Sequence, residues 1–321
     1  MSPRGRVFFL VVLAALAASA VVVVGVLATR TDVPAPPKPR AGRPPLALDL
    51  GVRAGRAAAE LRRAQTLYND DQVTQAAAIF GGYRSTEARI GSAFAAWPDG
   101  TVERLHALAG DQPRSSLVVL HLGLALYWAR RNQEAADAWR AAARLEPDTP
   151  YAVRAGDFLH PEFAPGLPRF VPSFRQPLAT RVLPPARRLA ALERAASKGG
   201  AHARLLYGSA LQELGRPRSA EREFAAAARL APQNPDARVA AAVGLFDKAN
   251  PSRAFAQLGP LTRAFPRAQT VRFHLGLLLL WSAQVVPAEK QLQQAIARDP
   301  DSLLGNQAKR YLTALRRVGT R

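Results

Sequence analysis

Along most of this chain, four residue types recur in a fixed order and at a fixed spacing. Each copy has a glycine or alanine, an alanine twelve positions later, a large apolar residue four positions after that, and a proline eight positions further on. The last three copies follow one another at a constant interval, whereas a longer stretch separates the first copy from the second. This regularity indicates helical hairpins that stack, because a single hairpin cannot bury its own apolar face. The copies are Gly123, Ala135, Trp139 and Pro147; Gly208, Ala220, Phe224 and Pro232; Ala242, Ala254, Leu258 and Pro266; and Gly276, Ala288, Leu292 and Pro300.

This pattern resembles the tetratricopeptide repeat (TPR), whose unit has the same length of about 34 residues. Small side chains let two antiparallel helices approach closely, and proline ends the second helix. The resemblance implies an all-α, right-handed solenoid over residues 53–321. We expect seven hairpins, of which the fourth is interrupted by a loop at 160–185, and a capping helix at 303–318. The expected hairpins span 53–81, 82–115, 116–149, 150–200, 201–234, 235–268 and 269–302.

Residues 7–28 carry no charge and, as a helix, are long enough to cross a bilayer. They follow a basic tail at 1–6 and precede a proline-rich segment at 29–52, which we interpret as a stiff linker. We favour an uncleaved transmembrane anchor, although Ala18, Ser19 and Ala20 also match a signal-peptide cleavage site. The expected location is the bacterial cytoplasmic membrane, with the solenoid outside the cytoplasm. A cytosolic solenoid stays open as the alternative, because basic residues flank the span on both sides.

The residues that most often carry catalysis are absent or scattered. The chain has no cysteine, and its five histidines form no cluster in the sequence. It also lacks the motifs of a zinc protease, a phosphate-binding loop or a nucleophilic serine. We therefore expect a protein that is not an enzyme and that uses neither metal nor cofactor.

Two nearly identical octapeptides, at 121–128 and 274–281, fall on the first helices of their repeats. In the family that the chain resembles, the first helices line a concave groove that binds segments of partner proteins. The resemblance thus implies an apolar groove, although the same side chains would also suit the interior of a hairpin. The lysine, arginine and asparagine clamp of the chaperone-binding members is absent. The candidate groove residues are Leu120, His121, Leu124, Tyr127 and Trp128, and Phe273, His274, Leu277, Leu280 and Trp281.

The loop at 160–185 combines seven prolines with Phe163, Phe170 and Phe174. So much proline excludes a helix, and three phenylalanines are not expected to face water. Either the loop packs into the groove of its own chain, which we favour, or it docks a partner.

Basic residues dominate the chain, with 44 Lys and Arg against 24 Asp and Glu, which gives a net charge of +20. Arg204, Arg238 and Arg272 recur once per repeat and predict a basic stripe, unless their stems pack while their charged groups reach water. We expect a membrane-anchored scaffold that binds partner proteins or peptides in envelope assembly, secretion or protein maturation. The alternative is a basic module that binds anionic envelope polymer or lipid head groups. Nucleic acid is not favoured, because no nucleic-acid-binding module is recognisable.

Overall fold

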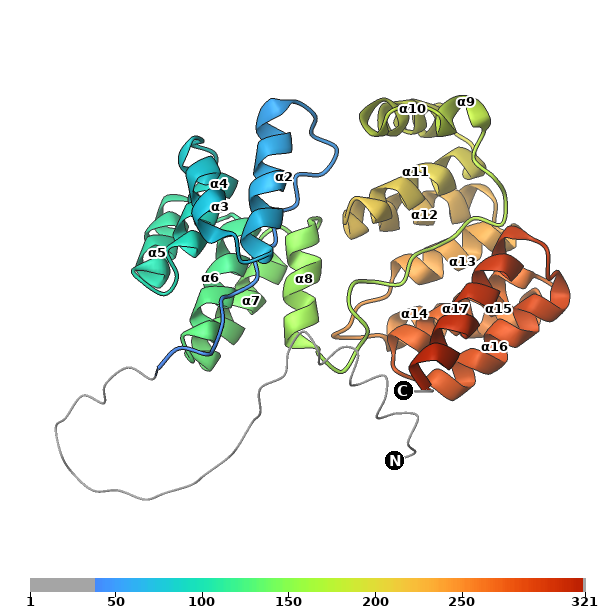
Figure 1. Ribbon diagram of the computed structural model, residues 1–321. Helices are drawn as coiled ribbons and strands as arrows, with labels where there is room; N and C mark the ends of the chain where they lie inside the picture. The colour runs from blue at the N-terminus through green and yellow to red at the C-terminus, as the bar shows by residue number, and fades with distance from the viewer. Residues whose placement is uncertain (1–37, 320–321) are drawn as a thin grey trace, which may run out of the picture.

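The computed structural model describes residues 38–319, and all regular secondary structure in that range is helical (Figure 1). The all-α class and the stacked hairpins are confirmed. The predicted tail and membrane anchor lie outside the described residues. Within the described range, no helix combines the length and apolar character needed to span a bilayer.

The first stack consists of three hairpins and a single helix. In each hairpin the first helix packs on the second, and the first helices contact one another in the order α2, α4, α6 and α8. We call this row of first helices the first-helix face of the stack. The bounds are α2 (Arg56–Asn69), α3 (Val73–Gly81), α4 (Thr86–Ala95), α5 (Thr101–Asp111), α6 (Ser116–Trp128), α7 (Asn132–Leu145) and α8 (Pro150–Leu159).

The second stack has the same plan, with the first-helix face formed by α11, α13, α15 and α17. Two further helices, α9 and α10, precede it, and α10 packs on α11. The bounds are α9 (Leu178–Arg181), α10 (Pro185–Ser197), α11 (Ala201–Glu213), α12 (Pro217–Leu230), α13 (Pro235–Gly244), α14 (Ser252–Ala264), α15 (Gln269–Trp281), α16 (Val285–Arg298) and α17 (Leu303–Gly319).

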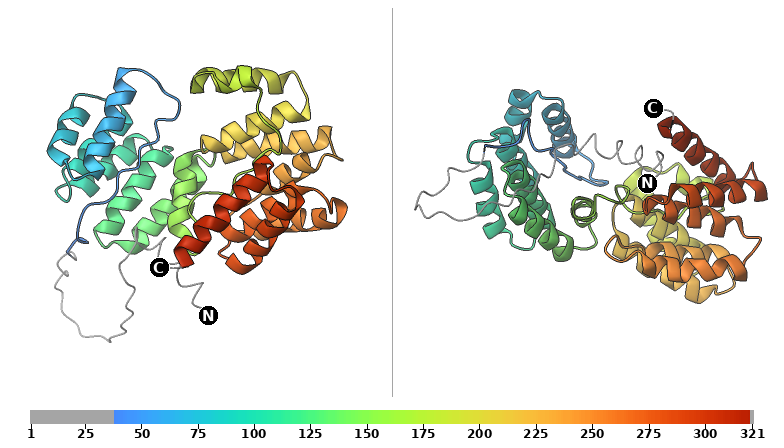
Figure 2. Two further views of the ribbon diagram at one scale, coloured as in Figure 1. Left: turned by 45° about the vertical axis from the view of Figure 1, so that its right-hand side comes forward. Right: turned by 90° about the horizontal axis from the view of Figure 1, so that it is seen from below.

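The two stacks have separate hydrophobic cores, and Figure 2 shows them as two groups of helices. The expectation of seven hairpins is therefore wrong: among residues 38–319 there are six, because α8 and α10 do not pack together as a hairpin. Residues 160–177, which lie between them, cross the second stack instead (Figure 1). Polar contacts join the stacks, from Ser219 to Asp148 and from Lys248 to Asp157.

Local signals in the sequence explain where many first helices begin. The side chains of Ser85, Ser115, Thr149 and Asn234 each accept a hydrogen bond from a backbone N–H in the first turn of the helix that follows. These caps satisfy donors that have no partner within a helix.

The recurring glycines mark the points where the two helices of a hairpin come closest. A Cβ atom added at Gly208 would overlap the ring of Phe224, and one at Gly123 would overlap the ring of Trp139. Glycine at these positions thus allows an aromatic ring of the second helix to lie directly against the first helix.

We predict that Gly208→Ala destabilises the chain by about 1–3 kcal/mol, because the added methyl group overpacks the contact with Phe224. The matched control is Gly110→Ala in α5, where a Cβ atom would meet nothing within 4 Å. That variant should gain up to about 1 kcal/mol, since alanine favours helix more than glycine does. Urea unfolding measures both changes, and equal effects would contradict this account of the repeat.

Candidate functional site

The segment that precedes α2 lies on the first-helix face of the first stack. We call residues 38–53 strap 1. Leu46, Leu48 and Leu50 are buried, with 2 %, 8 % and 4 % of their surfaces exposed, whereas Asp49 between them is exposed. The interpretation of 29–52 as a stiff linker is therefore wrong for residues 44–50. In this part of the chain only Pro45 and Asp49 are exposed, and the other side chains are buried against the helices.

Strap 1 is held through its backbone at several positions. The N–H of Arg40 donates to the carbonyl of Trp128 at 2.7 Å, and the Arg40 guanidinium lies 3.9 Å from the ring centre of Tyr127. The side-chain amide of Asn69, at the end of α2, binds both the N–H and the carbonyl of Leu46, each at 3.3 Å.

The third backbone contact involves a buried histidine in the middle of α6. The N–H of Ala47 donates to Nε2 of His121 at 3.3 Å. The contacts of strap 1 run from the C-terminal ends of the first helices towards their N-terminal ends, so strap 1 is antiparallel to these helices.

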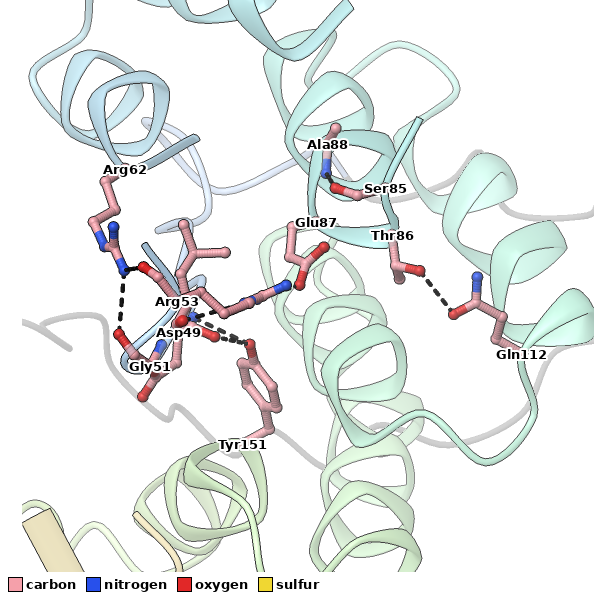
Figure 3. A network of polar contacts seen from close by, with 11 residues as sticks. Asp49, Gly51, Arg53, Arg62, Ser85, Thr86, Glu87, Ala88, Gln112 and Tyr151 are labelled. Atoms are coloured by element: carbon pink, nitrogen blue, oxygen red, sulfur yellow. Dashed lines mark hydrogen bonds and ion pairs between the residues drawn. The ribbon is translucent and has the colours of Figure 1, made fainter. Parts of the chain in front are cut away.

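Side chains fix the end of strap 1 near the start of α4 and α8 (Figure 3). The Arg53 guanidinium binds the carboxylate of Glu87 at 2.6 Å. The Tyr151 hydroxyl accepts from the N–H of Asp49 and donates to its carbonyl, at 3.1 and 2.8 Å. Arg62 donates to the carbonyls of Gly51 and of Arg53.

The loop between α8 and α9 lies on the second stack in the same way. We call residues 162–177 strap 2. The N–H of Ala164 donates to the carbonyl of Trp281 at 3.1 Å. The N–H groups of Phe170 and Val171 donate to Gln212 Oε1 at 2.8 Å and to His274 Nε2 at 2.9 Å, respectively. The buried Phe170 ring stacks on His274 with 5.0 Å between ring centres.

The two straps match residue for residue at an offset of 124. The pairs Arg40 and Ala164, Leu46 and Phe170, and Ala47 and Val171 make equivalent hydrogen bonds. Gly42 and Gly166 have the left-handed φ angles 77° and 72°, and Pro44 and Pro168 are both buried. The partner histidines lie at equivalent positions of α6 and α15. The chain therefore contains one unit twice, consisting of a strap, three hairpins and a closing helix, and residues 160–185 belong to the second unit rather than interrupting a repeat.

Both histidines are held neutral, in one tautomer. Nδ1 of His121 lies 2.7 Å from the carbonyl of Leu117, and Nδ1 of His274 lies 2.7 Å from that of Thr270. A carbonyl only accepts, so Nδ1 carries the proton and Nε2 is free to accept from the strap. Burial lowers the pKa of each histidine to about 4, although the bond to the carbonyl raises it in part.

Most of the predicted groove residues are buried in the structure. Five of them are buried in the cores of the stacks, whereas Tyr127, Trp128 and Trp281 are partly buried near the ends of the straps. The two histidines are also fully buried but contact the straps directly. The core residues are Leu120, Leu124, Phe273, Leu277 and Leu280.

The three loop phenylalanines differ in their surroundings. Phe170 is in the core, and the Phe174 ring lies edge-on to His202, with 4.6 Å between centres. Phe163 is partly buried beside His160.

Two of the arginines in the predicted basic stripe are engaged by other side chains. Arg204 binds Glu223 at 2.8 Å, and Arg272 donates to Gln291 at 3.2 Å. Arg238 is exposed and donates to the carbonyl of Pro232. These contacts lend little support to binding of a polyanion along this row.

The amide groups and carboxylates that contact the straps were not predicted from the sequence. These residues are Asn69, Gln212, Glu87 and Asp236. The alternation of Leu46, Leu48 and Leu50 with exposed Asp49 was the available signal for a packed, extended segment. His121 and His274 lie in different stacks, and within residues 38–319 no three acidic or histidine side chains form a group that could hold a metal ion.

No family model and no curated protein matches the chain. Several solved structures do. YrrB, a TPR protein with an unusual peptide-binding site, is 16 % identical, and the match covers 65 % of this chain and 99 % of YrrB at a TM-score of 0.32. PilW, a type IV pilus biogenesis factor, is 15 % identical, and the match covers 79 % of this chain and 99 % of PilW at a TM-score of 0.31. Yeast Tom70 is 12 % identical, and the match covers 86 % of this chain and 67 % of that Tom70 chain at a TM-score of 0.31. Values this low assign no function to this chain.

We predict that stability falls as pH decreases from 6.5 towards 4. The unfolded chain binds protons on His121 and His274 below pH 6.5, whereas the folded chain does so only near pH 4. Each histidine should therefore reduce the free energy of unfolding by about 2 kcal/mol between pH 7 and pH 5.

Urea unfolding at the two pH values measures this loss. His274→Gln should remove about half of it, whereas the control His106→Gln, at an exposed position, should leave it unchanged. An equal pH dependence in all three proteins would contradict the assignment.

Proposed function

We propose that this protein is a membrane-anchored scaffold that holds an extended segment of a partner protein on a first-helix face. The observation that carries the proposal is that both faces already hold an extended segment, each through three equivalent backbone contacts. Contacts to the backbone tolerate many sequences, whereas buried positions such as that of Phe170 select an apolar side chain. No catalytic step, metal or cofactor is part of this function.

The proposed anchor is residues 7–28, with the two stacks outside the cytoplasm of a bacterial cell. The start of strap 1 is fixed at Lys38, whose carbonyl accepts a hydrogen bond from Arg130 in the turn after α6. The nine residues between the anchor and strap 1 can extend over about 30 Å at most. In this proposal the first stack is held close to the bilayer, where it would meet exported proteins during envelope assembly, secretion or maturation.

We predict that a tag placed after Arg321 is cleaved by protease added to intact cells. The reason is that Arg4 and Arg6 favour a cytoplasmic N-terminus. Protection of the tag until the cells are lysed would reverse the orientation and make cytosolic proteins the candidate partners. A cytoplasmic marker protein that stays uncleaved is the control for cell integrity.

We also predict that opening the second face exposes a peptide-binding site. In the full chain in detergent, Phe170→Ala removes the buried ring of strap 2 and should weaken its hold on the face. A displayed library of linear peptides should then yield binders with a large apolar residue, and these should bind the wild-type chain at least about tenfold more weakly.

The binders should also lose affinity when Gln212→Ala is added, because the amide of Gln212 binds the strap backbone. The control is Arg229→Ala on the exposed side of α12, which should change nothing. If the opened chain enriches no peptides, the proposed function is wrong.

A further inference from the structure

The two stacks differ in how one buried carboxylate on each face is satisfied. In the first stack this group is Glu87, the second residue of α4, and it binds the guanidinium of Arg53 in strap 1. The equivalent residue in the second stack is Asp236, the second residue of α13 and only 4 % exposed. Its Oδ2 accepts from the N–H and the hydroxyl of Ser173 in strap 2. Its Oδ1 is buried and has no hydrogen-bond partner.

Strap 2 has no cation at the place where strap 1 has one. At the offset of 124, the residue that corresponds to Arg53 is Pro177. A buried carboxylate oxygen without a donor destabilises the folded state, because it has lost its hydrogen bonds to water and forms none with the protein.

Strap 2 also lacks the contacts that fix the end of strap 1. Tyr151 holds Asp49 by two hydrogen bonds in the first stack, whereas the corresponding residue of α17 is Leu304, whose side chain can form none. Strap 2 thus makes fewer polar contacts with the second face at its end than strap 1 makes with the first face.

We propose that the second face is the binding site for an extended partner segment with an arginine that pairs with Asp236, and that strap 2 is an internal ligand which this segment displaces. The proposal rests on the proposed function and names its site and the chemistry of its partner. The segment follows the features that the two straps share: a glycine, a proline two residues later and a large apolar residue two residues after that. In strap 1 the arginine, Arg53, follows the large apolar residue, Leu46, by seven positions, and we expect the same spacing in the partner segment.

An internal strap competes with any partner, because its tether gives it a high effective concentration, on the order of millimolar for short flexible links. A partner must therefore gain a contact that strap 2 does not make. A guanidinium at Asp236 supplies such a contact, since it can donate to Oδ1, which strap 2 leaves without a donor, and it adds the attraction between opposite charges.

The test uses a fluorescent peptide with the sequence of residues 40–55 and the full chain in detergent, with binding followed by anisotropy. Val171→Pro removes the backbone N–H that donates to His274, and so weakens the binding of strap 2 to the face. We expect the peptide to bind this variant at least about tenfold more tightly than the wild type. Circular dichroism checks that the variant is folded, and Phe170→Ala replaces it if it is not.

The arginine contact is tested by a double-mutant cycle in the opened chain. Asp236→Asn should weaken the peptide about tenfold, and so should Arg53→Ala in the peptide, whereas the two changes together should cost little more than either alone. Independent effects, or no effect of Asp236→Asn, would overturn the proposal.

Two further variants locate the peptide. Gln212→Ala should weaken it and Asn69→Ala should not, because these amides belong to the second and first faces, respectively. The reverse result would place the peptide on the first stack and overturn the proposal. If the full chain self-associates and Arg53→Ala abolishes this association, the occupant of the second face is strap 1 of a second copy of the chain. That result would overturn the proposal of a separate partner.

The peptide library tests the proposed function separately from this inference. If the opened chain selects peptides without arginine, and these bind equally well to the Asp236→Asn variant, the proposed function stands and this inference fails. If the opened chain binds neither the library peptides nor residues 40–55, both fail.

Discussion

The backbone contacts between each strap and its first-helix face are the interactions on which the rest of this structure depends. A stack of hairpins buries apolar side chains between helices, but its row of first helices remains to be covered. Here the chain covers each row itself, with an extended segment whose N–H groups meet a tryptophan carbonyl, a side-chain amide and a neutral histidine. Leu46 and Phe170 become part of the hydrophobic cores as a result.

Neutral histidine suits this role for a physical reason. A buried N–H of an extended strand needs an acceptor, and a charged acceptor would cost far more to bury. His121 and His274 each use Nδ1 to satisfy a carbonyl of their own helix and Nε2 to accept from the strap. Two polar groups in the face are thereby satisfied without any charge, which explains why both side chains tolerate complete burial.

The duplication makes the differences between the stacks informative. Both units keep the backbone contacts, the glycine with positive φ and the buried proline. The second unit differs at Pro177, Leu304 and Asp236, where it lacks the ion pair and the tyrosine contacts of the first. We interpret the first strap as a permanent part of its stack, and the second as a segment whose place a better ligand can take. We therefore expect a partner segment to bind at the second stack.

The sequence alone specified the all-α class and six of the seven expected helix pairs, because these depend on local spacing: glycine opposite a large side chain, and proline after the second helix. It also drew attention to His121, His274 and Phe170, since repetition and unusual composition are visible without coordinates. Tertiary packing established that residues 44–50 lie on a face rather than act as a linker, and that α8 and α10 belong to different stacks. It alone brought Asn69, Glu87, Gln212 and Asp236 to the straps. These contacts join residues 23 to 63 positions apart, and no local pattern encodes which distant segment will cover an apolar face.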